Sequence, residues 1–358
     1  MESISSLKEQ VPEKYVKEAQ KCLADTPVII LGSGASAPFN IPNMSILLEY
    51  LEKNIKVDEA VENDIKAWSN FLNISQNKGL EGALSEINLS PQLMQQLIDQ
   101  TWRLINREDQ EAFKSLIEGQ RTLPLTKLIK HLFRSTHRLI SIITPNYDRL
   151  AEYSSNQAGF NYFNGFRQGY IQAWEPEKMP CKYSNLRSSG REEPLRTVCI
   201  WKVHGSLDWF EDKNEVISSF PFTTSMPSQM KPLVITPGTQ KYRKAHTEPF
   251  RTILSQSDKA LENAKAFLCV GYGFNDEHIQ PKLIKNCNEN SALIVVLART
   301  MTEAAKKFLL QGKCKKFLAF EKSNTGTRVY SPECLQGHEL KELELWDFEQ
   351  FLNYVLSE

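Results

Sequence analysis

The stretch that decides the fold is Pro27-Val28-Ile29-Ile30-Leu31-Gly32-Ser33-Gly34-Ala35-Ser36. Residues 28–31 form a short uncharged run rich in β-branched side chains, which predicts a strand buried on both faces of a sheet. The run ends in two glycines, which permit positive φ and let a ligand approach the backbone. A helix that starts here would point N–H groups and partial positive charge outward, which suits a pyrophosphate. A plain tight turn has the same glycines, so the other motifs decide between the two interpretations.

Length and composition indicate a globular protein without a bulk charge preference. The 358 residues suffice for one large domain or two ordinary ones, and 41% of them are hydrophobic. Lys and Arg number 43, as do Asp and Glu, so the net charge is zero and we expect no direct nucleic-acid binding. Apolar runs are too short to cross a bilayer, and the polar residues 1–14 do not resemble a signal peptide. We therefore expect no membrane association and a cytoplasmic protein.

The cysteines argue against a zinc site. There are seven, and no two of them form a Cys-x-x-Cys pair. An odd number of scattered cysteines is typical of a reducing compartment. We therefore expect no metal ion. Their positions are Cys22, Cys181, Cys199, Cys269, Cys287, Cys314 and Cys334.

Strand and helix patterns alternate along most of the chain, which predicts an α/β protein with a Rossmann-like parallel sheet covered on both faces. Further strands are expected at 139–143, 198–203, 233–235, 266–270 and 292–297, with helices at 247–264, 276–286 and 301–312. Residues 154–194 are polar and aromatic, and we expect them to be irregular.

Two segments differ from this alternation. Residues 57–122 carry apolar side chains at helical spacings and show no strand pattern, which predicts a helical insertion. Residues 340–356 have the pattern of an amphipathic helix. We therefore expect residues 1–56 and 123–320 to form the Rossmann-like domain, and 321–358 to form a C-terminal helical extension.

Polar residues follow several predicted strands at their carboxyl ends, which is where doubly wound sheets bind ligands. Each alone has an ordinary explanation, such as a turn or a helix cap, but together they predict one site at one sheet edge. The candidates are Gly32, Ser33, Gly34, Ala35 and Ser36 after the first strand, Asn146 and Asp148 after the second, His204 after the third, and Gly271, Tyr272, Gly273, Asn275 and Asp276 after a later one.

The ordered motifs resemble the sirtuin family of NAD-consuming proteins over roughly residues 27–300. Gly32-Ser33-Gly34-Ala35-Ser36 is similar to the family's G-A-G-x-S turn, which holds the NAD pyrophosphate. Thr144-Pro145-Asn146-Tyr147-Asp148 is similar to T-Q-N-I-D, whose Asn and Asp contact the nicotinamide side. His204-Gly205-Ser206 matches the motif of the catalytic histidine. Gly271-Tyr272-Gly273 stands where sirtuins have G-T-S at the adenosine side. Ile41-Pro42-Asn43-Met44 resembles I-P-D-F without its Asp and Phe, which makes Asn43 a further cofactor-binding candidate.

The sequence departs from the family pattern in the region where protein-deacylating sirtuins bind zinc. Protein-deacylating sirtuins carry two C-x-x-C pairs after H-G-S, and residues 207–235 contain no cysteine. His204-Gly205-Ser206-Leu207-Asp208-Trp209 and Gly271-Tyr272-Gly273-Phe274-Asn275-Asp276 resemble instead the sirtuin-like proteins of bacterial anti-phage defence, which hydrolyse NAD. Among these, the chain is most similar to the compact subunit paired with a HerA-type hexameric ATPase. This resemblance implies a zinc-free fold and NAD as the substrate.

The resemblance and the residue chemistry together assign roles. Histidine side chains titrate near neutrality, so His204 is the natural general base for water or a ribose hydroxyl. Asn146 would orient the attacking water or the ribose, and Asp148 would bind the carboxamide or steady Asn146. Asn275 and Asp276 would reach the adenosine ribose, although Asp276 has the pattern of a helix cap as well.

Three functions remain open at this point. The first is an NAD+ glycohydrolase that depletes cellular NAD+ during infection. The second is a deacylase or ADP-ribosyltransferase, and the third is a subunit that binds NAD or ADP-ribose without turnover. Control by assembly is expected, with a homo-oligomer that docks onto a HerA-type ATPase. The basic cluster at 241–244 is interpreted as a solvated loop.

Overall fold

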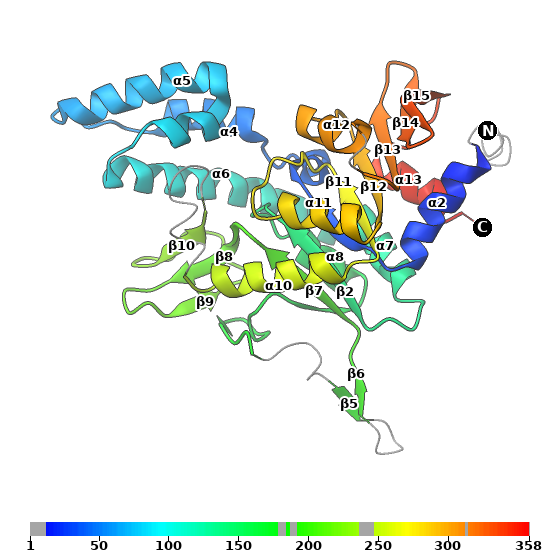
Figure 1. Cartoon of the computed structure of the whole chain (residues 1–358). Helices are drawn as coiled ribbons and strands as arrows, with labels where there is room; N and C mark the ends of the chain where they lie inside the picture. Colours follow the sequence, from blue (N-terminus) through cyan, green and yellow to red (C-terminus); the bar gives the residue numbers. More distant parts are fainter. Residues whose placement is uncertain (1–11, 178–183, 187–191, 236–246, 312–313, 358) are drawn as a thin grey trace.

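A nine-stranded sheet forms the centre of the protein (Figure 1). The computed structural model describes residues 12–177, 184–186, 192–235, 247–311 and 314–357. The strands lie in the order β15 (Cys334–Lys341), β14 (Gly326–Ser331), β13 (Phe317–Lys322), β12 (Leu293–Ala298), β11 (Ala266–Val270), β1 (Val28–Leu31), β2 (Leu139–Thr144), β7 (Thr197–Lys202) and β3 (Asn161–Phe163).

The strand β1 occupies the middle of the sheet. It pairs in parallel with β11 on one side and with β2 on the other, and Ile29 is the register partner of both Leu268 and Ile142. The chain builds β2 and β7 outward in one direction and then returns to build β11, β12 and β13 in the other. Such a reversal opens a crevice at the carboxyl ends of the strands, where ligands of doubly wound sheets bind.

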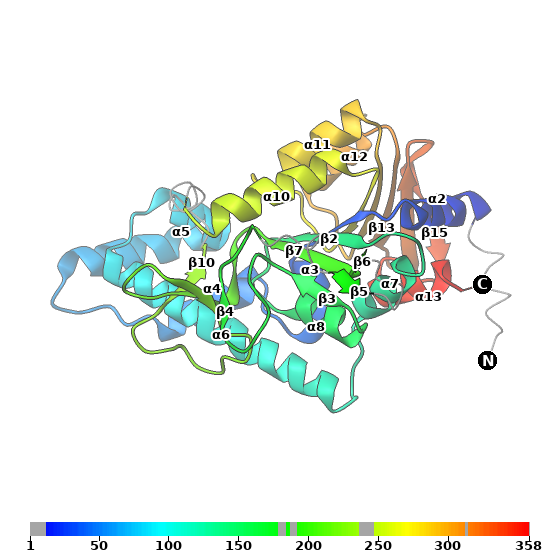
Figure 2. The same ribbon diagram turned by 90° about the horizontal axis from the view of Figure 1, so that it is seen from below.

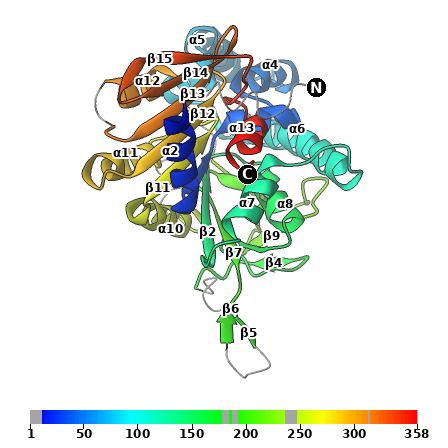
Figure 3. The ribbon, with the colours of Figure 1, turned by 90° about the vertical axis from the view of Figure 1, so that its right-hand side faces the viewer.

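Helices cover both faces of the sheet, as Figures 2 and 3 show. Ile29 and Leu31 face one layer, which contains α2 (Glu13–Ala24), α7 (Pro124–Leu132), α8 (Leu150–Gln157) and α13 (Phe348–Val355). Val28 and Ile30 face the other, which contains α10 (Phe250–Asn263), α11 (Gln280–Glu289) and α12 (Glu303–Leu310). Burial on both faces explains why this strand has no polar side chain. The predicted α/β class with a parallel sheet is confirmed.

The segment between β1 and β2 is helical and has its own core. It contains α4 (Met44–Asn54), α5 (Glu62–Glu86) and α6 (Pro91–Ile117), with a backbone kink at Gly79, where φ is 70°. Trp68 and Phe71 stack at 4.9 Å between ring centroids inside this small core. The long helix α6 then runs back to the main body, where Trp102 Nε1 donates to the carbonyl of Leu207 at 2.7 Å.

A second, antiparallel sheet packs beside the first. Its strand order is β10 (Lys231–Val234), β8 (Gly205–Glu211), β9 (Ile217–Ser219) and β4 (Gln172–Ala173). The strand expected at 233–235 therefore belongs to this sheet and not to the parallel one. Residues 154–194 are also more regular than expected, because they include β3, β4 and the hairpin of β5 (Ser184–Leu186) and β6 (Glu192–Pro194).

The C-terminal region corrects the expectation of a helical extension. Residues 326–341 form β14 and β15, an antiparallel hairpin at the edge of the main sheet, and only α13 is helical after them. In β14 the buried Thr327 and Val329 alternate with the exposed Arg328, which pairs with Glu339 at 3.1 Å across the hairpin. This period of two is a strand pattern, and the helical spacing of the residues that follow obscured it.

Some expectations fall on parts of the chain outside the described residues, namely 236–238, the basic cluster 241–244 and Cys181. In the described part of the chain, no helix combines the length and apolar character that crossing a membrane requires.

Candidate functional site

The two glycine turns at the centre of the sheet pack directly against each other. Gly32 N–H donates to the carbonyl of Val270 at 3.0 Å, and Gly34 N–H donates to that of Gly271 at 3.1 Å. A Cβ atom on Gly34 would lie 2.7 Å from the Cα of Gly271, and one on Gly271, whose φ is +57°, would lie 2.4 Å from the Cα of Gly34. Glycine is therefore required so that the turn after β1 and the turn after β11 can touch.

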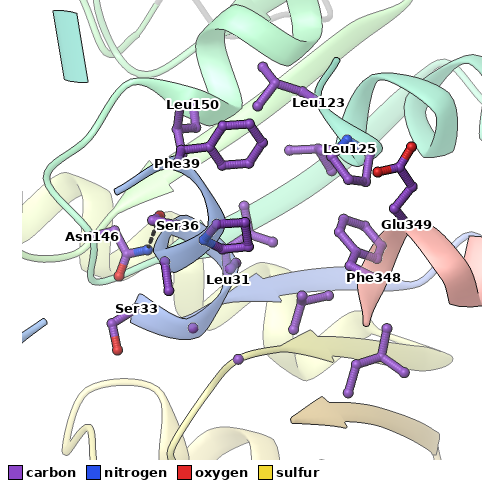
Figure 4. Close-up of a pocket in the computed structure, with 18 of the residues that line it drawn as sticks. Leu31, Ser33, Ser36, Phe39, Leu123, Leu125, Asn146, Leu150, Phe348 and Glu349 are labelled. Carbon is purple, nitrogen blue, oxygen red and sulfur yellow. Dashed lines mark hydrogen bonds between the residues drawn. The ribbon is translucent and has the colours of Figure 1, made fainter. Parts of the chain in front are cut away.

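These contacts correct part of the expected anion site. The N–H groups of Gly32 and Gly34 are bonded to the neighbouring strand, and that of Ala35 donates to the Gly32 carbonyl at 3.0 Å. They are not free to bind a pyrophosphate. Ser33 to Ala35 instead line the wall of a large cavity, in which the hydroxyl group of Ser36 is hydrogen-bonded to Asn146 (Figure 4).

Asn146 is held by a chain of hydrogen bonds. Its Nδ2 donates to the carbonyl of Gly32 at 2.9 Å and to Ser36 Oγ at 3.0 Å. Ser36 Oγ in turn donates to Asp148 Oδ2 at 2.7 Å, and Leu150 N–H donates to Asp148 Oδ1 at 3.2 Å. Asp148 is buried, and this burial raises the pKa of its carboxyl group. Of its two expected roles, this geometry matches the steadying of Asn146, whose Oδ1 points away from Ser36 in Figure 4.

His204 and Asp276 form a pair across the carboxyl edge of the sheet. His204 follows β7 and Asp276 follows β11, and His204 Nε2 lies 2.9 Å from Asp276 Oδ2. The other carboxylate oxygen, Oδ1, accepts from the N–H groups of His278 and Ile279 at 2.9 and 3.1 Å. Asp276 therefore caps the following turn with one oxygen and lies within ion-pair distance of an imidazole with the other. His204 Nε2 is not aligned for a hydrogen bond with this oxygen and has no hydrogen-bond partner among the described residues.

The remaining residues of the second glycine turn surround this pair. Phe274 is fully buried at φ 58°, a left-handed conformation that is costly for a bulky residue. The flanking Tyr272 is buried, and its hydroxyl has no hydrogen-bond partner among the described residues. Gly273 accepts a hydrogen bond at its carbonyl from Thr302 Oγ1. The exposed Asn275 lines the same cavity as His204. An orphaned hydroxyl and a strained turn beside a cavity are typical of a ligand site.

Two cavities meet at Ser33, Ser36, Asn146 and Asp148, which line both. The smaller, the histidine cavity, measures about 220 Å³ and contains His204, Tyr272 and Asp276. The larger, the nucleotide cavity, measures about 820 Å³ and extends past Gly271 to the end of β12 and to the start of α13. Their sizes and their shared wall suit an extended ligand with one small end and one large end.

Several lining residues were not predicted. Glu81 of α5 and Ile105 of α6 close the histidine cavity, so the helical insertion contributes to this site. Arg299, at the end of β12, lines the nucleotide cavity, and its exposed side chain has no hydrogen bond or ion pair within the described part of the chain. An arginine directly after a predicted strand was a usable signal, whereas nothing in the sequence marks Glu81. Asn43 also lines this cavity, but its Oδ1 caps α4 by accepting from Ser45 and Ile46.

A buried lysine supports the turn that carries Asn146. Lys202 ends β7 and is fully buried. Its Nζ donates to the carbonyl of Tyr147 at 3.2 Å, to that of Asp148 and to Ser206 Oγ at 2.8 Å. Burying an ammonium group is costly unless it is paired, and Glu152 lies 3.3 Å away. The lysine therefore fixes the backbone on which two candidate site residues stand.

Metal ligands are not gathered anywhere in the described residues. No group of three or more His, Cys, Asp or Glu side chains there is placed to hold a metal ion. The described cysteines are free, and all but Cys334 are buried.

One family model matches about half of the chain. Residues 140–314 match the family model of the SIR2-like domain. That range includes Asn146, Asp148, His204 and the turn from Gly271 to Asp276, and the Gly32–Ser36 turn precedes it. Among curated proteins, no match is found.

Solved structures of Sir2 proteins are similar at low identity. A Sir2 homologue in complex with NAD is 13% identical, with a TM-score of 0.43, over 86% of this chain and 88% of its own. A structure reported for the mechanism and regulation of Sir2 enzymes is 16% identical, with a TM-score of 0.39, over 82% and 89%. Sir2Tm bound to a propionylated peptide is 13% identical, with a TM-score of 0.39, over 80% and 87%.

Proposed function

We propose that this protein is an NAD+ glycohydrolase, which cleaves the bond between nicotinamide and ribose and releases nicotinamide and ADP-ribose. The observation that carries the proposal is the 2.9 Å contact between His204 Nε2 and Asp276 Oδ2, in a cavity shared with Asn146. This histidine lies within the residues that match the SIR2-like domain. The arrangement supplies a base, a carboxylate next to it and an amide in the same cavity.

His204 would act as the general base. With its Nε2 beside the Asp276 carboxylate, His204 would accept at Nδ1 the proton of a water molecule or of a ribose hydroxyl group. The carboxylate stabilises the imidazolium ion that results, in the way that an aspartate supports the histidine of a catalytic triad. The water oxygen then bonds to the ribose carbon as the bond to nicotinamide breaks. The bonding electrons leave with nicotinamide, which departs as a neutral molecule because it was cationic in NAD+.

Asn146 would position the nucleophile or the sugar. Its Nδ2 donors are used by Gly32 and Ser36, so its Oδ1 remains to accept from water or a ribose hydroxyl. A fixed acceptor lowers the entropic cost of bringing water to the ribose carbon. The hydrogen-bond chain through Ser36 to Asp148 holds the amide in this orientation.

The two cavities would divide the dinucleotide between them. Nicotinamide and its ribose would occupy the histidine cavity, and the adenosine would occupy the larger nucleotide cavity. Because the N–H groups of Gly32 and Gly34 are already bonded, the positive charge for the phosphates would come from Arg299. A guanidinium group binds phosphate oxygens through two parallel hydrogen bonds.

The test is incubation of the purified chain with NAD+, followed by chromatography of nicotinamide and ADP-ribose. We expect His204→Ala and Asn146→Ala to abolish cleavage and to keep the fold. Loss of a general base costs about 10²–10⁴ in rate. His338→Ala, an exposed histidine on β15, is the matched control. A folded His204→Ala variant that turns over NAD+ like the wild type would refute the proposal.

The biological role that we propose is depletion of cytoplasmic NAD+ in anti-phage defence. The motif resemblance supports it, and unrestrained NAD+ hydrolysis would harm the host.

Control of the activity would come from assembly into a homo-oligomer and with a HerA-type ATPase. The helical insertion offers exposed apolar side chains for such contacts. They are Val61, Ile65 and Ile117. The test measures the oligomeric state by light scattering and NAD+ turnover in the same samples, with and without the ATPase. A monomer whose NAD+ turnover is unchanged by any partner would contradict the proposal.

A further inference from the structure

A third cavity lies on the other side of α8 from the nucleotide cavity. It measures about 610 Å³ and is bounded by α6, α8, the segment 162–172 and residues 221–222. Ala151 and Ser154 of α8 line the nucleotide cavity, whereas Glu152 and Tyr153 line this one. We name it the α8 cavity. It shares no lining residue with the two cavities of the proposed active site.

Aromatic side chains form its rim. Tyr170 is 83% exposed and Phe222 is 65% exposed, and their ring centroids lie 5.8 Å apart. Both line the cavity, together with Phe113 and Tyr153, whose rings pack at 4.8 Å. Large aromatic side chains left in solvent beside a cavity are typical of a binding site. Their faces attract planar groups and cations.

The lining also includes a carboxylate without a hydrogen bond. Glu152 is 4% exposed, and neither of its carboxylate oxygens accepts a hydrogen bond in the described part of the chain. Its neighbour Lys202 lies 3.3 Å away, but the three N–H donors of that ammonium group go to Tyr147, Asp148 and Ser206. Gln172 also lines the cavity, and its Oε1 accepts none among the described residues. Buried acceptors without donors are costly, and such groups call for a partner.

The buried charges around this lining are unbalanced. Arg149 is matched by Asp109, with Nη2 and Oδ2 2.6 Å apart. Within the described part of the chain, the Asp208 carboxylate accepts hydrogen bonds only from neutral hydroxyl groups, those of Ser206 and Ser219. Among the described residues, Lys202 is therefore the single cation left for three buried carboxylates, those of Asp148, Glu152 and Asp208. The surplus of negative charge favours either a proton or a cationic guest.

We propose that the α8 cavity binds a small planar organic cation, such as an aromatic amidinium or guanidinium compound. The rim rings of Tyr170 and Phe222 would hold its face, and its charge would offset the surplus around Glu152. Its N–H groups would donate to the acceptors that the protein leaves unpaired. The α8 cavity shares no lining residue with the two cavities proposed for NAD+ cleavage, although Asp148 and Lys202 contribute to the charge balance of both.

Benzamidine is the probe, because it is planar, aromatic and cationic. Its binding to the full chain is measured by isothermal titration calorimetry beside benzamide, which is neutral, and benzoate, which is anionic. We expect benzamidine to bind with a stoichiometry of one and the other two to bind at least about tenfold more weakly. Equal binding of benzamide, or no binding of benzamidine, would overturn the proposal.

Two variants locate the bound probe. Glu152→Gln keeps the shape and removes the charge, and we expect it to weaken benzamidine binding by about tenfold or more. Phe222→Ala removes an exposed rim ring and should weaken it by about threefold or more. Leu335→Ala, an exposed apolar residue on β15, is the control and should change nothing. If Glu152→Gln does not fold, the Phe222 variant decides, since unchanged affinity there would place the probe elsewhere and refute the assignment.

Discussion

Replacement of Asp276 by asparagine tests the histidine–carboxylate pair directly. Asn keeps an oxygen that can accept from the N–H groups of His278 and Ile279, so the cap at the following turn is preserved. What it removes is the negative charge 2.9 Å from His204 Nε2. The fold should therefore remain while the imidazolium form of His204 loses its support.

The size of the effect follows from that distance. Two unit charges 2.9 Å apart attract by about 1.4 kcal/mol in bulk water and by about 6 kcal/mol at an effective dielectric constant of about 20. The side chains of His204 and Asp276 are only 12% and 8% exposed, which places the pair toward the second value. Every 1.4 kcal/mol or so is a factor of ten in rate, so we expect kcat for NAD+ cleavage to fall by about 10²–10⁴. KM should change little, because the charge is lost chiefly in the transition state.

The assay is nicotinamide release measured by chromatography, with the melting temperature of each variant recorded beside it. Asp212→Asn is the matched control, because the Oδ1 of Asp212 also accepts from two backbone N–H groups, those of Asn214 and Val216, and Asp212 lines none of the three cavities. A folded Asp276→Asn protein with wild-type kcat would refute the role assigned to the pair. A loss of kcat in Asp212→Asn as large as that in Asp276→Asn would show that the assay reports general damage.

Three further predictions concern Glu81 in the histidine cavity, the buried Glu152 and Gly34 in the turn after β1. Glu81→Gln should lower kcat/KM for NAD+ about tenfold without changing the melting temperature, because a carboxylate that lines the histidine cavity would stabilise positive charge on the ribose in the transition state. Glu86→Gln on the same helix is the control. Burial raises the pKa of the Glu152 carboxyl group from 4.5 to about 7. The preference of the folded state for the protonated carboxyl group therefore stabilises the protein fully below pH 4.5, and this stabilisation is lost as the pH rises to 7. The free energy of unfolding of the wild type, measured with urea, should fall over that window by up to about 3 kcal/mol relative to Glu152→Gln, and parallel pH profiles would contradict this. Gly34→Ala should lower the free energy of unfolding by about 2–3 kcal/mol, because its Cβ would lie 2.7 Å from the Cα of Gly271 in the opposite turn. Gly159→Ala, in open space at φ +84°, should lower it by only about 1 kcal/mol through backbone strain. Equal losses in the two variants would contradict the contact between the turns.

The sequence predicted those features that repeat along the chain. Val28 to Leu31 could be recognised as a buried parallel strand because burial on both faces removes every polar side chain. Asn146, His204 and Asp276 could be placed near one another because parallel strands end at the same edge of the sheet. The hairpin of β14 and β15 was missed, although Thr327, Arg328 and Val329 alternate clearly, since the helical pattern of the following residues was extended over it.

What the sequence could not supply is which donors and acceptors remain after packing. The glycines after β1 are the same residues whether their N–H groups face a ligand or the carbonyls of Val270 and Gly271, and only the contact between two turns more than 200 residues apart decides it. Asp276 was expected either to cap a helix or to bind a ligand, and its two oxygens let it cap a turn and lie beside His204 at once. In the sequence Lys202 is only a residue near the end of an expected strand. In the structure its three N–H groups donate to Tyr147, Asp148 and Ser206, and therefore the carboxylate of Glu152 accepts no hydrogen bond from it. Both the proposed active site and the α8 cavity thus depend on hydrogen bonds between distant segments, which no local pattern encodes.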